Sequence, residues 1–123
     1  MQVIAIALGG ATGAVMRFWT STAVYALLGR EFPWGTLAVN VLGSLAMGFL
    51  SVILVERMVV SPEWRAALLI GFLGAFTTFS TFSLETLHLM EQGAYVRALL
   101  NTIFSVVLCV AAAWMGLLAA RQL

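Results

Sequence analysis

The sequence predicts an all-α membrane protein with four transmembrane helices, folded as one domain over residues 1–123. Of these 123 residues, 63% are hydrophobic and 9% are charged, whereas soluble domains carry roughly 25% charged residues. A chain this short has too small an interior to hide so much apolar surface from water, so lipid must cover it. Four apolar stretches each reach the roughly 20 residues that cross a bilayer.

The first span is predicted over residues 3–28 and the second over residues 35–55, with Arg30 and Glu31 in the connection between them. No Lys or Arg precedes the first stretch, and the stretch is longer than a signal-peptide core. We therefore interpret it as a membrane span and not as a cleaved signal. Trp34 lies near the start of the second span, where amphipathic rings favour the headgroup level.

The third span is predicted to follow Ser61 and Pro62, which suit an N-cap and a first helical position, and to reach residue 90. A short polar connection leads to the fourth span, predicted over residues 94–120. Trp64 and Tyr95 lie near the starts of these two spans, again as expected for rings at a membrane interface.

The arginines give little preference for one orientation. Arg57, Arg65 and Arg121 fall on the side of both termini, and Arg30 and Arg97 fall on the other side. The positive-inside rule usually works through a clear excess of Lys and Arg. Two opposed copies forming an antiparallel dimer, like the inverted repeats of transporters, are compatible with this balance. A single orientation set by the small bias is equally compatible.

The first two spans contain polar groups at membrane depth, where such groups usually face a bundle interior or a water-filled cavity. Gly9 and Gly13 have the small-xxx-small spacing that lets two helices approach closely. Arg17 either holds helix-end carbonyls or forms an electropositive vestibule that attracts anions. Asn40 is either an interhelical hydrogen-bonding group or a donor to a permeating anion.

The third span is the most informative, because residues 71–83 contain two Gly, five hydroxyl residues and four Phe. Gly, Thr and competing hydroxyls weaken a helix, so a break is predicted near residues 74–78. Freed carbonyls at such a break can coordinate a small cation. Phe79 and Phe82 share one helical face, and their ring edges can stabilise an anion, with ordinary aromatic packing as the alternative.

Polar residues also mark the fourth span and the end of the third. Asn101, Ser105 and Cys109 recur every four residues and form a polar stripe on one face. Glu85 is either a structural partner or a gating group. The single Cys excludes a disulfide within one chain, and the lone His88 has no nearby His or Cys with which to bind a metal.

Three motifs in this chain resemble those of the Fluc (CrcB) fluoride channels. They are Gly9-Gly-x-x-Gly13-x-x-x-Arg17, Gly35-Thr-Leu-x-Val-Asn40-x-x-Gly43 and Gly74-x-x-Thr-Thr-Phe79-Ser-Thr-Phe82, of which the third is the most specific. The resemblance implies a dual-topology antiparallel homodimer with two fluoride pores and a structural Na⁺ at its centre. It also implies passive fluoride efflux across a bacterial plasma membrane, which protects the cell from fluoride toxicity.

The resemblance also implies residue roles. Phe79 and Phe82 would be edge-on fluoride ligands, and Asn40 would donate its amide to the same path. Ser80 and Thr81 would extend the path as a polar track, together with Ser105 and with Asn101, where some members carry Tyr. Gly74 and Thr77 would offer backbone carbonyls to the Na⁺, and Arg17 would line the aqueous entrance.

Other function classes are disfavoured. A net charge of +1 without a basic run argues against nucleic-acid binding. No nucleotide-binding motif or nucleophile arrangement is present, which argues against an enzyme or a pump. A small multidrug-type antiporter also has four spans, but such proteins resemble one another in a Glu on the first span, where this chain has Arg17. A purely structural subunit would explain the glycines but not Asn40, Phe79 and Phe82.

Overall fold

The protein is described by a computed structural model that covers residues 1–57 and 60–123, and no strand occurs within these residues. Four helical spans in it are long and apolar enough to cross a membrane, namely Gln2–Leu28, Trp34–Arg57, Pro62–Glu91 and Tyr95–Arg121. They confirm the predicted all-α architecture with four spans and bounds within two residues at most ends. The chain is a multi-pass membrane protein.

The first and fourth spans are single helices, α1 (Gln2–Leu28) and α6 (Tyr95–Arg121). The second consists of α2 (Trp34–Ser51) and a π-helical end, η1 (Val52–Arg57). The third is divided into α3 (Pro62–Arg65), the π-helical η2 (Ala66–Phe72), α4 (Leu73–Phe76) and α5 (Phe79–Glu91). The two π-helical stretches have wider turns than an α-helix, and no feature of the sequence predicted them.

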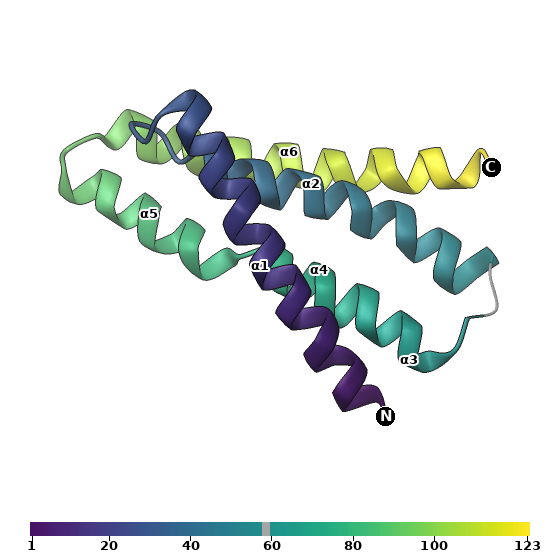
Figure 1. The fold of residues 1–123 in the computed structure, drawn as a ribbon. Coiled ribbons are helices and arrows are strands. Elements are labelled where there is room, and N and C mark those ends of the chain that lie inside the picture. The colour runs from purple at the N-terminus through teal and green to yellow at the C-terminus, as the bar shows by residue number, and fades with distance from the viewer. Residues whose placement is uncertain (58–59) are drawn as a thin grey trace.

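The spans run up and down, so that alternate connections share an end of the bundle (Figure 1). Both termini lie toward the end at which η1 finishes and α3 begins, and the other two connections lie at the opposite end (Figure 1). One end therefore carries Arg57, Arg65 and Arg121, and the other carries Arg30 and Arg97, as the sequence predicted.

Helix ends follow local capping rules. Ser61 is the N-cap of α3, because its side chain accepts a hydrogen bond from the Trp64 N–H at 3.4 Å, and Pro62 follows at the first helical position. Both assignments confirm the prediction. At the far end of the bundle, Gly29 and Gly93 have φ of 84° and 78°, values that favour glycine, and they turn the chain after α1 and α5.

Glycines allow two close helix crossings. A Cβ atom on Gly9 or Gly13 would overlap the carbonyl oxygens of Ala67 and Phe72, so α1 lies backbone to backbone on η2. The small-xxx-small interpretation of this pair is therefore confirmed. Gly48 and Gly116 allow the same approach between α2 and α6, where added Cβ atoms would meet the carbonyls of Ala113 and Leu45.

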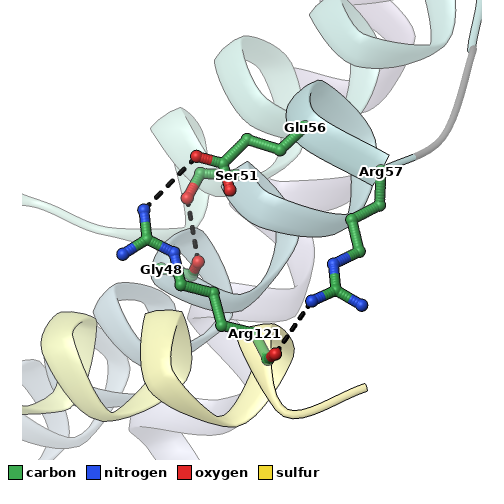
Figure 2. A network of polar contacts seen from close by, with 5 residues as sticks. All are labelled: Gly48, Ser51, Glu56, Arg57 and Arg121. Carbon is green, nitrogen blue, oxygen red and sulfur yellow. Dashed lines mark hydrogen bonds and ion pairs between the residues drawn. The ribbon is translucent and has the colours of Figure 1, made fainter.

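A polar network joins the ends of the second and fourth spans (Figure 2). The Arg57 guanidinium donates to the Arg121 carbonyl oxygen at 2.8 Å and so caps the last turn of α6. The Arg121 guanidinium forms an ion pair with Glu56 at 3.3 Å, and both side chains are about half exposed. The Ser51 hydroxyl donates to the Gly48 carbonyl at 2.8 Å within α2. We call Glu56, Arg57 and Arg121 the terminal network.

Candidate functional site

The third span is interrupted halfway along its length. Thr77 and Thr78 lie between α4 and α5 with extended backbone, at φ −89°, ψ 157° and φ −151°, ψ 118°. Non-helical backbone at membrane depth must find hydrogen-bond partners within the protein. The side chains around these two residues supply them.

Asn40 of α2 supports the interruption from a neighbouring helix. Its Nδ2 donates to the Thr78 carbonyl at 3.0 Å, and its Oδ1 accepts from the Thr78 N–H at 2.7 Å. The amide therefore replaces the helical partner of the Thr78 N–H and adds a donor to the Thr78 carbonyl, which as an N-cap carbonyl also accepts the first bond of α5. Because a carboxamide nitrogen carries two hydrogens, a second N–H of Asn40 is left for another acceptor.

Thr78 in turn caps α5. Its Oγ1 accepts from the Thr81 N–H at 3.2 Å and donates to the Thr81 hydroxyl at 3.0 Å, and the Ser80 hydroxyl lies 3.4 Å away. A side chain that accepts from the N3 backbone N–H is the usual N-cap arrangement. Three hydroxyls are thus grouped at the start of α5.

These side-chain bonds explain the release of two of the backbone carbonyls at the interruption. In a continuous α-helix the Thr78 N–H would donate to Gly74 and the Thr81 N–H to Thr77. Here the first donates to Asn40 and the second to the Thr78 hydroxyl. Gly74 is exposed, and Thr77 packs its methyl group against Gly43 of α2, where a Cβ atom would overlap it. The carbonyls of Gly74 and Thr77 are therefore among the oxygens that the interruption makes available, together with those of Ala75 and Phe76 at the end of α4.

A groove of about 430 Å³ opens beside the interruption and runs between α2, α5 and α6. The rings of Phe79 and Phe82 stand at one side of it, 5.3 Å apart between centroids and tilted by 47°. Phe79 is 78% exposed, an unusual state for an aromatic ring next to a polar cluster in the middle of a bundle. Among the groove-lining residues are Asn40, Thr77, Thr78, Phe79, Phe82 and Ser105.

A smaller cavity of about 160 Å³ lies on the other side of Thr78. We call it the Arg17 cavity, because Arg17 is the charged residue in its wall. Within the described residues no ion pair or hydrogen bond of the Arg17 guanidinium is found, and its role stays a prediction. The remaining wall is formed by Phe18, Ser21, Thr36, Val39, Thr78 and Thr81.

A third cavity, of about 340 Å³, lies at the end of the bundle that holds residues 29–33 and 92–94. We call it the mouth cavity. The Tyr25 hydroxyl donates to Glu85 Oε2 at 2.5 Å and lies 3.3 Å from the Thr36 hydroxyl. Thr36 also faces the Arg17 cavity, so these contacts join the two cavities. The mouth cavity is lined mainly by Tyr25, Arg30, Glu31, Glu85, His88 and Arg97.

The structure brings most of the predicted site residues together. Asn40, Phe79, Phe82, Thr77 and Ser105 line the groove, and Cys109 follows Ser105 along the same wall. Thr81 and Arg17 line the Arg17 cavity, whereas Ser80 is exposed beside Thr78. Glu85 has a structural partner in Tyr25 and also faces the mouth cavity.

Asn101 lies apart from these cavities. It is 2% exposed, its Nδ2 donates to the Thr86 hydroxyl at 2.9 Å, and the Ser105 hydroxyl donates to its Oδ1 at 3.5 Å. These bonds join α6 to α5. Its place on an ion path stays a prediction.

Sequence reasoning missed Tyr25 and Thr36. The signal was present, because Arg17, Ser21 and Tyr25 recur every four residues on the first span, as Thr36 and Asn40 do on the second. No cluster of three or more His, Cys, Asp or Glu side chains occurs among residues 1–57 and 60–123. A cation bound there would have to use other oxygens, such as backbone carbonyls.

Comparison with known proteins finds a family match over nearly the whole chain. The family described as "CrcB-like protein, Camphor Resistance (CrcB)" matches residues 4–117. A protein of Methylococcus capsulatus named fluoride-specific ion channel FluC is 58% identical over 123 residues, which are all of this chain and 54% of that relative. Relatives with the same name from Magnetococcus marinus and Coxiella burnetii are 57% and 51% identical, and the matches cover 98% and 100% of both partners. The chain thus spans about half of the first relative and nearly all of the other two.

Proposed function

Because this chain belongs to the CrcB family, whose matched members are named as fluoride channels and not as enzymes, we propose that it is a fluoride-selective channel. In this proposal fluoride leaves a bacterial cell passively through the plasma membrane, which protects the cell from fluoride toxicity. The observation that carries the proposal is the succession of hydrogen-bond donors from Asn40 to Thr81, beside the tilted Phe79 and Phe82.

The chemistry of this succession suits fluoride. The ion is small and strongly hydrated, so a selective path must replace its water with several convergent donors. The second N–H of Asn40, the hydroxyls of Ser80 and Thr81 and the ring edges of Phe79 and Phe82 can do so without a full charge. Weak, successive sites let the ion leave as readily as it enters. The nearby charge of Arg17 attracts anions toward the path.

The channel is proposed to be an antiparallel homodimer with two pores. Support comes from Gly74, Phe79 and Ser80, which are exposed although they border interrupted backbone in the middle of a span. Such backbone must be buried in protein or line a cavity. A second copy in the opposite orientation would cover this face, and the near balance of arginines at the two ends permits both orientations.

A structural Na⁺ is proposed at the centre of this dimer. The carbonyls of Gly74 and Thr77 would hold it, since the N–H groups that would occupy them in a helix donate to Asn40 and Thr78. Unwound backbone carbonyls are the usual ligands of Na⁺ in membrane transporters. The ion would neutralise the carbonyl dipoles where the two copies meet.

Reconstitution into liposomes tests the channel. Liposomes loaded with potassium fluoride and made permeable to K⁺ by valinomycin should release fluoride to an electrode within seconds to minutes, and chloride-loaded liposomes should not release chloride. Well-folded protein that releases no fluoride, or that releases both anions alike, would falsify the proposal.

Replacement of Na⁺ by N-methylglucamine throughout purification tests the proposed Na⁺ site. It should lower the thermal stability of the dimer, whereas an unchanged melting temperature would contradict the ion's structural role.

A further inference from the structure

The methyl group of Thr77 occupies a notch in α2 that a glycine leaves open. Gly43 is buried, and a Cβ atom added to it would overlap the Thr77 methyl carbon and lie 3.3 Å from the Phe76 ring. We call this contact the Gly43 notch. Any side chain at position 43 must therefore displace Thr77.

Thr77 cannot avoid such a side chain by rotating. Its hydroxyl donates to the Leu73 carbonyl oxygen at 3.0 Å, and its backbone N–H donates to the same oxygen at 3.1 Å. The Cβ atom of threonine carries both the hydroxyl and the methyl group, so a rotation that takes the methyl group out of the notch also breaks the hydroxyl bond. A group that fills the notch therefore moves the backbone of Thr77 and not only its side chain.

The backbone of Thr77 carries one of the carbonyls that the interruption releases. This carbonyl shares a peptide plane with the N–H of Thr78, and in a trans peptide the two bonds point in opposite directions. Asn40 Oδ1 accepts from that N–H at 2.7 Å. The Thr77 carbonyl therefore points away from the Asn40 amide.

Helix α2 thus holds this peptide plane at both ends. Asn40 and Gly43 are three residues apart and lie on one face of α2. The amide holds the N–H end through Thr78, and the notch holds the carbonyl end through the side chain of Thr77. The direction of the Thr77 carbonyl is therefore set by a neighbouring helix that contributes neither of the two carbonyls proposed for the Na⁺.

We propose that Gly43 is a positioning residue for the structural Na⁺, because the Gly43 notch fixes the direction of the Thr77 carbonyl. The inference rests on the proposed Na⁺ site and deepens it. Gly43 has no side chain and is no ligand of the ion, so it acts only through Thr77. Groups behind a metal ligand that fix its orientation typically change the metal affinity by about 10–100-fold when they are altered.

A Na⁺ titration of thermal stability tests the proposal. Protein purified in N-methylglucamine is titrated with Na⁺ at constant ionic strength, and its melting temperature in detergent is measured, because an ion that binds the folded state raises it. The quantity compared is the Na⁺ concentration that gives a fixed rise above each variant's own Na⁺-free melting temperature. We expect Gly43→Ala to increase this concentration by about 10–100-fold.

A double variant moves the methyl group across the contact. Gly43→Ala adds a methyl group on α2, and Thr77→Ser removes one from the third span but keeps the hydroxyl, so together they fill the notch from the other side. We expect the double variant to need a Na⁺ concentration close to that of the wild type. A double variant that needs as much Na⁺ as Gly43→Ala overturns the proposal.

The double variant keeps the test decisive if Gly43→Ala alone does not fold. Thr77→Ser by itself leaves the notch empty and the carbonyl less firmly held, so it should need more Na⁺ than the double variant does. Equal Na⁺ requirements of these two variants overturn the proposal. Circular dichroism and size-exclusion elution establish which variants are folded.

Two other glycines separate the direction of the carbonyl from packing in general. Gly48→Ala fills an equally tight contact on the same helix, against the carbonyl of Ala113, so it should lower the Na⁺-free melting temperature but keep the wild-type Na⁺ requirement. Gly10→Ala, whose Cβ atom would lie 3.8 Å from the Gly71 carbonyl oxygen, should match the wild type in both. A Na⁺ requirement raised as much by Gly48→Ala as by Gly43→Ala overturns the proposal.

The same titration distinguishes failure of the notch from failure of the Na⁺ site. A wild type that melts at one temperature with and without Na⁺ overturns the proposed site and the positioning role together. A wild type that responds to Na⁺, beside a folded Gly43→Ala that responds at the same concentrations, leaves the site standing and overturns the role of Gly43 alone. No fluoride is present in these measurements, so neither result depends on conduction.

Discussion

Two polar networks in this protein use different groups in opposite surroundings. The terminal network joins Glu56, Arg57 and Arg121 at one end of the bundle, where the ion pair is about half exposed (Figure 2). The network around Asn40 and Thr78 lies halfway along the third span and holds backbone that has no helical partner. Exposed ion pairs contribute about 0–1 kcal/mol, whereas an unsatisfied buried polar group costs about 1–3 kcal/mol. The charged terminal network therefore contributes less to the stability of the protein than the neutral amide of Asn40 does.

Removal of the Asn40 amide should have the largest effect. Asn40→Ala leaves the Thr78 N–H without its partner, so we expect a loss of about 1–3 kcal/mol in the free energy of unfolding and loss of fluoride efflux. Thermal unfolding in detergent and the liposome assay measure the two effects. Asn101→Ala, which removes a buried amide from α6 without touching the interruption, is a matched comparison for the stability measurement only. Wild-type efflux in Asn40→Ala would contradict its role.

Phe79→Ile and Phe82→Ile should separate conduction from stability. Each change removes the ring edges that we assign to the anion but keeps an apolar side chain, so efflux should fall strongly while the dimer persists. The liposome assay measures efflux, and size exclusion or chemical crosslinking measures the dimer. Phe104→Ile, on the partly exposed face of α6, is the control. Unchanged efflux in both variants would refute the assigned role of the rings.

Loss of the cap hydroxyl should have a smaller effect. Thr78→Val keeps the backbone bonds to Asn40 but removes the acceptor for the Thr81 N–H, so we expect a loss of about 1 kcal/mol in the free energy of unfolding. Thr78→Ser should be close to wild type. Denaturation in detergent compares the two variants. A Val variant as stable as the Ser variant would show that the hydroxyl does not support the start of α5.

Changes in the terminal network should have the smallest effect. Glu56→Gln removes the ion pair with Arg121, and we expect a change below about 1 kcal/mol and wild-type efflux. The small difference should shrink further in high salt, since exposed pairs are screened. Melting curves at low and high salt check this. A change as large as that of Asn40→Ala would overturn the comparison between the two networks.

Much of the fold and part of the site were predictable. Apolar length located the four spans, the Gly9 and Gly13 spacing located a close crossing, and the composition of residues 71–83 indicated where a helix is weak. Partner choice was not predictable, because Asn40 and Thr78 are 38 residues apart and Tyr25 and Glu85 are 60 apart. Such pairs depend on how the helices cross. The π-helical turns of η1 and η2 likewise depend on packing and not on local propensity.

The position of the two termini also restricts how two copies could be joined in one polypeptide. Because both ends of the chain lie toward the same end of the bundle, a water-soluble linker would hold two fused copies in the same orientation (Figure 1). A fused pair with opposite orientations needs a linker that itself crosses the bilayer once, such as one added helix of about 20 residues. The number of membrane crossings in the linker, odd or even, therefore decides whether a tandem fusion can reproduce the proposed dimer.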